Sequence, residues 1–167
     1  MTKPKIAIIL GSDSDLPMME EGLKVLRNFS APFELKVLSA HRSPGLVHAF
    51  TRSAGKRGIK VIIAGAGGAA HLAGVVASLT RLPVIGVPIE TKSLRGIDSL
   101  LSTVQMPSGV PVATMAIGKA GAKNAAIFAL QILGINDSKI AKKLEAFKKK
   151  LSADVAAKNR VYSKRKL

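Results

Sequence analysis

Apolar runs alternate with amphipathic stretches along most of this chain. Uninterrupted apolar runs are typical of strands buried on both faces of a parallel sheet, whereas apolar residues three to four positions apart indicate helices. Strands are expected at residues 6–10, 33–38, 60–64 and 83–88, with a weaker candidate at 112–117. Helices are expected at residues 16–28, from 44 onward, at 70–79 and at 119–133. This alternation predicts a three-layer αβα fold, with a doubly wound, flavodoxin-like parallel sheet.

The C-terminal part has a different pattern. Its apolar residues recur at helical spacing and form one stripe: Ile140, Leu144, Phe147, Leu151 and Val155. Such a stripe needs a surface to cover, on its own domain or on a neighbouring subunit. We therefore expect an αβα catalytic domain over residues 1–135 and a basic C-terminal helix and tail over residues 136–167. The stretch 158–167 is expected to fray.

Composition narrows the range of functions. The chain has 167 residues and no cysteine, which excludes disulfides, thiolate nucleophiles and cysteine zinc sites. Its histidines and acidic residues show no metal-ligand spacing, so we expect no metal. It has neither a signal-peptide core nor an apolar run of about 18 residues. A cytoplasmic protein with no membrane partner is the expectation.

The net charge of +16 favours anionic partners, whether phosphorylated substrates or nucleic acid. The charge is concentrated at the C-terminus, where residues 139–167 hold eleven Lys or Arg and two acidic residues. With one tyrosine and no tryptophan, the chain lacks aromatic residues for a platform on which single-stranded nucleic acid could stack. We interpret the basic tail as a solvated helix face, and nucleic acid is not an expected partner.

Three unusual loops follow three successive predicted strands, at residues 11–15, 39–44 and 64–72. In open parallel sheets, ligands bind beyond the carboxyl ends of the strands. The second loop contains His41, which can move a proton near neutral pH, and Arg42, which can fork onto a phosphate. Together the three loops predict one composite site.

The first and third loops offer complementary chemistry. Ser12 and Ser14 can cap the following helix or donate to an anion, whereas Asp15 suits sugar hydroxyls better than phosphate. The glycines and alanines at residues 64–70 would let the backbone approach a flat ligand, or would serve close helix–sheet packing. The remaining histidines have simpler interpretations: His48 as a surface residue and His71 as a structural residue at a helix start.

Seven motifs occur in order and at characteristic spacing. They are Gly11-Ser12-x-Ser14-Asp15, Ser39-Ala40-His41-Arg42-x-Pro44, Ile62 to Leu72, Gly86-Val87-Pro88, Asp98 to Ser102, Gln105 to Val112, and Ala116 to Ala126. Over about residues 5–135 this set resembles the class I N5-carboxyaminoimidazole ribonucleotide mutase family of purine (IMP) biosynthesis. The chain departs at Ala73 and Val75, where that family usually has proline and methionine, and the loss of the proline is expected to loosen the loop.

The resemblance implies an isomerase that moves a carboxyl group within an aminoimidazole ribotide, with carbon dioxide as a bound intermediate. It implies no ATP, metal or organic cofactor, and a homo-octamer with active sites at subunit junctions. His41 would be the general acid and base. The substrate-binding residues implied are Ser12, Ser14, Asp15, Ser39, Arg42, Ala66, Gly67 and Leu72.

Three other functions remain open at this point. The first is the related aminoimidazole ribonucleotide carboxylase, a lyase that uses free carbon dioxide, although residues 67–72 resemble the mutase loop. The second is a non-catalytic nucleotide or flavin binder of flavodoxin type, against which His41 and Arg42 count. The third is a nucleic-acid binder driven by the basic tail.

Overall fold

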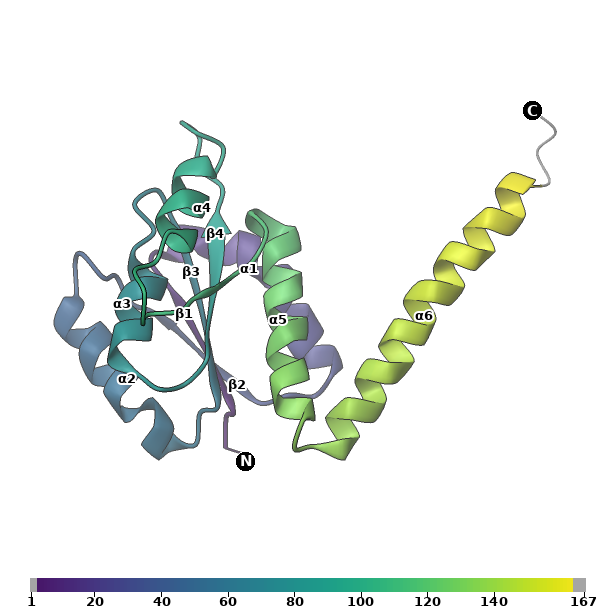
Figure 1. The fold of residues 1–167 in the computed structure, drawn as a ribbon, viewed down its shortest axis with the longest axis horizontal. Helices are drawn as coiled ribbons and strands as arrows, with labels where there is room; N and C mark the ends of the chain where they lie inside the picture. The colour runs from purple at the N-terminus through teal and green to yellow at the C-terminus, as the bar shows by residue number, and fades with distance from the viewer. Residues whose placement is uncertain (1–2, 164–167) are drawn as a thin grey trace. The chain divides into compact units, whose positions relative to one another are not determined.

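A computed structural model describes residues 3–163 of the chain (Figure 1). Its centre is one sheet whose strands are β1 (Ile6–Leu10), β2 (Phe33–Val37), β3 (Val61–Gly67), β4 (Val84–Ile89) and β5 (Ala113–Thr114). The strand order is β2-β1-β3-β4-β5, and each neighbouring pair is parallel. This is the flavodoxin-like order, so the predicted fold class is confirmed.

The helices are α1 (Leu16–Asn28), α2 (Pro44–Arg57), α3 (Leu72–Leu79), α4 (Ile97–Val104), α5 (Gly118–Gly134) and α6 (Ser138–Ser163), with a 3-10 turn, η1, at Asp13–Asp15. In Figure 1, α1 and α5 lie on one face of the sheet, and α2 and α3 lie on the other. The α1–α5 contact is close because Gly22 has no side chain. A Cβ atom there would lie 2.5 Å from the Ala122 carbonyl oxygen.

The core lies on both faces of the central strands. All residues of β1 and β4 are buried, as their uninterrupted apolar runs predict. On one face, Ile62, Val47 and Val76 belong to a single buried cluster that joins β3 to α2 and α3. Strand β2 lies at the edge of the sheet and is only partly buried.

Three elements differ from the expectation. Strand β3 continues to Gly67, because the small residues at its end still pair with β4. Strand β5 has only two residues. Helix α4 was not predicted, because its apolar residues Ile97, Leu101 and Val104 are exposed while Ser99 and Thr103 are buried.

The chain forms two compact units, whose boundary lies within α5, between Ala129 and Leu130. In the second unit, α6 continues through Ser163 rather than fraying from residue 158, and residues 164–167 lie outside the described part of the chain. Of its apolar stripe, Leu144 is buried, whereas Leu151 and Val155 are 49% and 59% exposed. Among the described residues, no helix is long and apolar enough to cross a membrane.

Candidate functional site

The loops that follow β1, β2 and β3 surround a cavity of about 530 Å³, a size typical of small-molecule sites. It lies at the carboxyl ends of these strands, which are neighbours in the sheet. The end of β4 adds Ile89, Glu90 and Thr91, which the sequence did not mark as site residues. The nine residues that the sequence singled out all line this cavity: Ser12, Ser14, Asp15, Ser39, His41, Arg42, Ala66, Gly67 and Leu72.

Pairing between the strands brings the loops together. The Gly11 amide donates to the Gly65 carbonyl at 2.9 Å, so the first loop starts against β3. The Leu38 amide donates to the Leu10 carbonyl at 2.8 Å, which sets the second loop beside the first. Ser12 and Leu72, which are 60 positions apart in the sequence, therefore line the same cavity.

The first loop is a capping box around η1. The Ser14 amide donates to the Ser12 hydroxyl, and the Ser12 amide donates to the Asp15 carboxylate at 3.0 Å. The Ser14 hydroxyl donates to Ser12 Oγ at 2.9 Å. Both serines thus take part in capping and also line the cavity, so capping leaves them within reach of a ligand there.

Asp15 is the one buried ionisable residue of the cavity lining, at 7% exposed. Burial raises the pKa of its carboxyl group above the ordinary value, because the charged form loses water. The hydrogen bond from the Ser12 amide lowers this pKa, the charge of Asp13 raises it, and the positive charge of Arg42 lowers it. A buried carboxyl group that holds one backbone amide can still accept hydrogen bonds from hydroxyl groups.

The second loop positions Arg42 over the first. Its guanidinium donates from Nη2 to the Gly11 carbonyl at 3.1 Å. Its own backbone amide donates to Ser39 Oγ at 3.1 Å, which fixes the turn before α2. The guanidinium is exposed and has donors left for an anion, beside the hydroxyl groups of Ser12 and Ser14.

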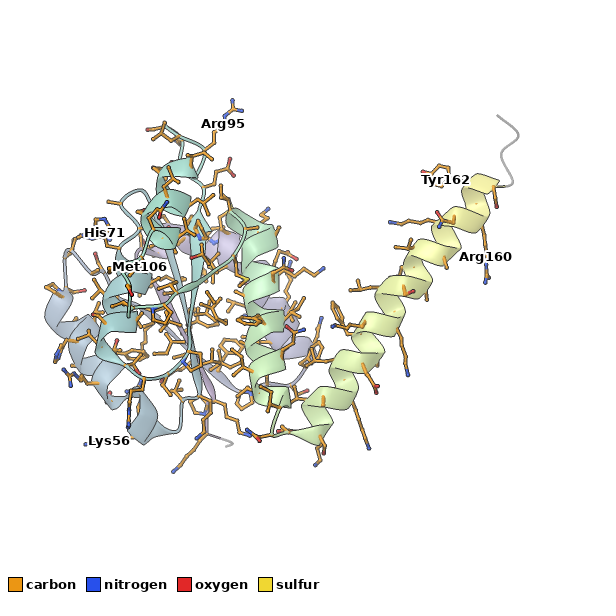
Figure 2. The ribbon with its side chains drawn as sticks, in the orientation of Figure 1. Lys56, His71, Arg95, Met106, Arg160 and Tyr162 are labelled. Atoms are coloured by element: carbon orange, nitrogen blue, oxygen red, sulfur yellow. The ribbon has the colours of Figure 1, made fainter. Side chains whose placement is uncertain are left out.

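His41 contacts His71, a residue from the third loop. His41 Nε2 lies 3.0 Å from His71 Nδ1, and the two rings meet edge to face at 82°. Both side chains are exposed, and Figure 2 shows His71 on the loop that leads into α3. Capping does not explain His71: its side chain makes no capping hydrogen bond to α3 and instead lies within hydrogen-bond distance of His41. His48 is exposed on α2, as predicted.

The third loop lines the cavity mainly with backbone atoms, because most of its residues there have small side chains or none. Gly67, Gly68 and Ala69 line it, and Gly68 has a φ of +68°, which favours glycine. Two serines of α4, Ser99 and Ser102, hydrogen-bond the backbone of this loop. The sequence contained them within the Asp98–Ser102 motif, but nothing in the local pattern indicated that they face the loop.

Residues 3–163 contain no group of three or more His, Asp or Glu side chains that could hold a metal ion. The cavity instead combines one guanidinium, several hydroxyl groups, a buried carboxyl group and an imidazole pair. Such a set can bind a phosphorylated sugar and move a proton at a group held next to it.

Comparison with known proteins decides the family. The AIR carboxylase family model matches residues 5–154. The chain belongs to the AIR carboxylase family. Both the family resemblance and the fold predicted from the sequence are therefore confirmed.

This AIR carboxylase family member has close curated relatives. It is 60% identical to the N5-carboxyaminoimidazole ribonucleotide mutase of Pyrococcus abyssi, over 87% of this chain and 82% of the relative. It is 57% identical to the protein of the same name from Saccharolobus solfataricus, over 91% and 95%. A phosphoribosylaminoimidazole carboxylase of Saccharomyces cerevisiae is 54% identical over 95% of this chain but only 27% of the yeast protein.

A solved structure gives the same fold. The crystal structure of Treponema denticola PurE superposes with a TM-score of 0.85 at 26% identity, over 97% of this chain and 99% of that one. The match extends over nearly the whole length of both proteins.

Proposed function

We propose that this chain is an N5-carboxyaminoimidazole ribonucleotide mutase of purine biosynthesis, in which His41 is the proton carrier. The enzyme moves a carboxyl group from the exocyclic nitrogen of the ribotide to ring carbon C4. Curated relatives that bear this name are 60% and 57% identical to the chain. The single observation that carries the assignment of roles is the shared cavity. There His41 lies beside Arg42 and the third loop, residues 64–72, which is called the glycine-rich loop from here on.

The substrate phosphate is assigned to Arg42, with help from Ser14 and Ser39. The support is electrostatic, because Arg42 is the one cationic side chain that lines the cavity among the described residues. Arginine forms strong, charge-assisted hydrogen bonds with phosphate oxygens. Ser12 and Asp15 lie deeper in the first loop and are assigned to the rest of the ribotide, with Asp15 on the ribose hydroxyl groups.

The reaction needs one proton in each of two steps. In the first, the carbamate N–C bond breaks, its electron pair stays on nitrogen, and His41 donates a proton to that nitrogen as carbon dioxide leaves. In the second, ring C4 attacks the retained carbon dioxide, and His41 takes the proton that C4 loses. Atoms and charge balance without another reactant, so the scheme uses no ATP, metal or organic cofactor.

The carbon dioxide between the two steps is assigned to the backbone around Ala66 and Gly67 and to the Leu72 side chain. Carbon dioxide is small and uncharged, so enclosure rather than a charged contact must hold it. A lining of small residues and apolar carbon suits this purpose. A water-excluding pocket also prevents loss of the intermediate.

The alternative is a carboxylase that takes free carbon dioxide, and the observation in favour of a carboxylase is the yeast relative named phosphoribosylaminoimidazole carboxylase. Two labelled reactions separate the alternatives. A mutase converts the carboxyl-labelled carbamate without ATP, in the presence of EDTA, and incorporates little label from dissolved carbon dioxide. Rapid labelling of the product from the unsubstituted ribotide and labelled bicarbonate, with no use of the carbamate, would overturn the mutase assignment.

We assign the chemistry to residues 1–135 and propose that residues 136–167 serve assembly into a homo-octamer. Exposed apolar side chains on α4 and α6 support a larger assembly. On α4 these are Ile97 (50% exposed), Leu101 (53%) and Val104 (47%), a face that a monomer would leave in water. A phosphorylated substrate does not cross a bilayer readily, which supports a place in the cytoplasm.

A further inference from the structure

The glycine-rich loop between β3 and α3 has few hydrogen bonds of its own. The Ala70 amide donates to the Gly68 carbonyl and the His71 amide donates to the Ala69 carbonyl, each at 2.8 Å. Both bonds close three-residue turns, so they join only neighbouring residues of the loop and do not tie it to another element. The loop therefore depends on outside contacts to keep its shape.

Helix α4 supplies those contacts through two hydroxyl groups. Ser99 Oγ accepts from the Gly68 amide at 2.9 Å and donates to the Ile89 carbonyl at 2.6 Å. Ser99 is fully buried, so water cannot replace it. This one hydroxyl ties the loop to the end of β4, and Gly68 and Ile89 both line the cavity.

Ser102 makes a second attachment one turn further along α4. Its Oγ accepts from the Ala70 amide at 3.0 Å and lies 3.1 Å from the Gly68 carbonyl and 2.7 Å from the Asp98 carbonyl. The loop is thus fixed at two points on either side of Ala69, which faces the cavity. The next residue, His71, contacts His41.

We infer that Ser99 and Ser102 are positioning residues that keep the glycine-rich loop closed while carbon dioxide is free in the cavity. This inference rests on the proposed function. Neither serine lines the cavity, so both act through the backbone that they hold. Once the carbamate has broken, recapture at C4 competes with escape, and a loop held in place against the cavity leaves less room for the carbon dioxide to escape. The two serines therefore set the fraction of carbon dioxide that is retained.

The experiment measures that fraction directly. The carbamate, labelled in its carboxyl group, is mixed with excess enzyme in a single turnover, and label in the C4 product is compared with label released as carbon dioxide. A reaction without enzyme gives the spontaneous loss. Removing one or two hydrogen bonds changes a two-state population by about 5- to 30-fold. We expect Ser99→Ala and Ser102→Ala to raise enzyme-dependent label loss by at least about fivefold.

Two variants serve as controls. Thr103→Val removes another buried α4 hydroxyl group, one that donates only to the Ser99 carbonyl of the same helix and does not touch the loop. It should retain label as the wild type does. Ser102→Thr keeps a hydroxyl group at a half-buried position and should restore retention. Thermal unfolding, measured in parallel, shows which variants are folded at the assay temperature.

The outcomes are distinct. If folded Ser102→Ala and Ser99→Ala retain label as well as the wild type, the serines do not control the loop. This inference is then wrong, whereas the proposed function is unaffected. If Thr103→Val loses as much label as they do, general loosening of α4 explains the effect and the inference fails as well. If the wild-type protein makes no C4 carboxylate, the proposed function and this inference fail together. Should Ser99→Ala not fold, the half-buried Ser102 decides the question.

Discussion

Replacement of His41 by asparagine tests the proposed mechanism most directly. The His41 side chain is exposed, so its removal leaves no cavity in the core and should change the free energy of unfolding little. Asparagine can still form a hydrogen bond with His71, which lies 3.0 Å from His41 Nε2 in the wild type. Asparagine cannot, however, carry a proton between substrate atoms. The variant thus separates proton transfer from folding and binding.

The expected loss can be bounded. General acid–base groups contribute about 10²- to 10⁴-fold in rate, which corresponds to roughly 2.7–5.4 kcal/mol at 1.36 kcal/mol per factor of ten. His41 would serve two proton steps, so His41→Asn should lose turnover near or above the upper end of that range. The affinity for the ribotide should stay close to the wild-type value, because Arg42 and its serines are unchanged.

The assay follows conversion of the carbamate ribotide by steady-state kinetics, with ribotide affinity measured by calorimetry. His48→Asn is the matched control, since His48 is exposed on α2 and does not line the cavity. It should behave as the wild type does. If His41→Asn keeps more than about a tenth of wild-type turnover, the loss is far smaller than the expected loss of about 10²- to 10⁴-fold. His41 is then not the proton carrier. His71, the partner of His41, then becomes the candidate.

Three further predictions concern binding, pH and assembly. Arg42→Ala should weaken ribotide binding by about tenfold or more, since hydrogen bonds to charged groups contribute about 1.5–3 kcal/mol, and Arg42→Lys should restore only part of it; unchanged affinity in calorimetry would refute the phosphate assignment. Because burial raises the folded-state pKa of Asp15 above 3.8, the folded protein binds the extra proton, and this contribution to stability is lost as the pH rises through the folded pKa. Asp15→Asn should therefore unfold at a higher temperature than the wild type at neutral pH while binding the ribotide less tightly, with Glu145→Gln, at an exposed carboxylate outside the cavity lining, as the control; equal unfolding temperatures would contradict the first part. Light scattering should give the mass of an octamer, and Leu101→Asp on the exposed face of α4 should give smaller species; a wild-type monomer at all concentrations would contradict the assembly.

The fold could be predicted because its strands are buried on both faces. The run at Ile6–Leu10 is apolar at every position, and the structure buries every position. Helix α1 begins and ends where its apolar spacing predicts. The candidate site could be predicted in outline for a topological reason: loops that follow neighbouring parallel strands meet at one edge of the sheet.

Two features could not be predicted because they depend on contacts distant in sequence. His71 lies 30 positions from His41, and a histidine at a helix start has a sufficient local explanation. Helix α4 misleads for the opposite reason, since its apolar residues face outward and its serine and threonine residues face inward. A rule that assigns apolar residues to the core would bury the wrong face of this helix. It would also place Ser99 and Ser102, which hold the loop, on the solvent side.

The departure at Ala73 shows how the structure changes an expectation from sequence. Ala73 is the second residue of α3 and is buried, and a Cβ atom at Gly86 of β4 would lie 3.4 Å from the Ala73 Cβ. Backbone amides in the first turn of a helix have no acceptor within it, so a proline at this position removes no helical hydrogen bond and alanine adds none. The loss of proline then acts mainly through the greater freedom of the unfolded chain, an effect of about 0.4–1 kcal/mol. The loop itself is held by Ser99 and Ser102, which lie outside it. Alanine in place of proline should therefore lower the free energy of unfolding slightly. The position of the loop should not change, because Ser99 and Ser102 of α4 hold it.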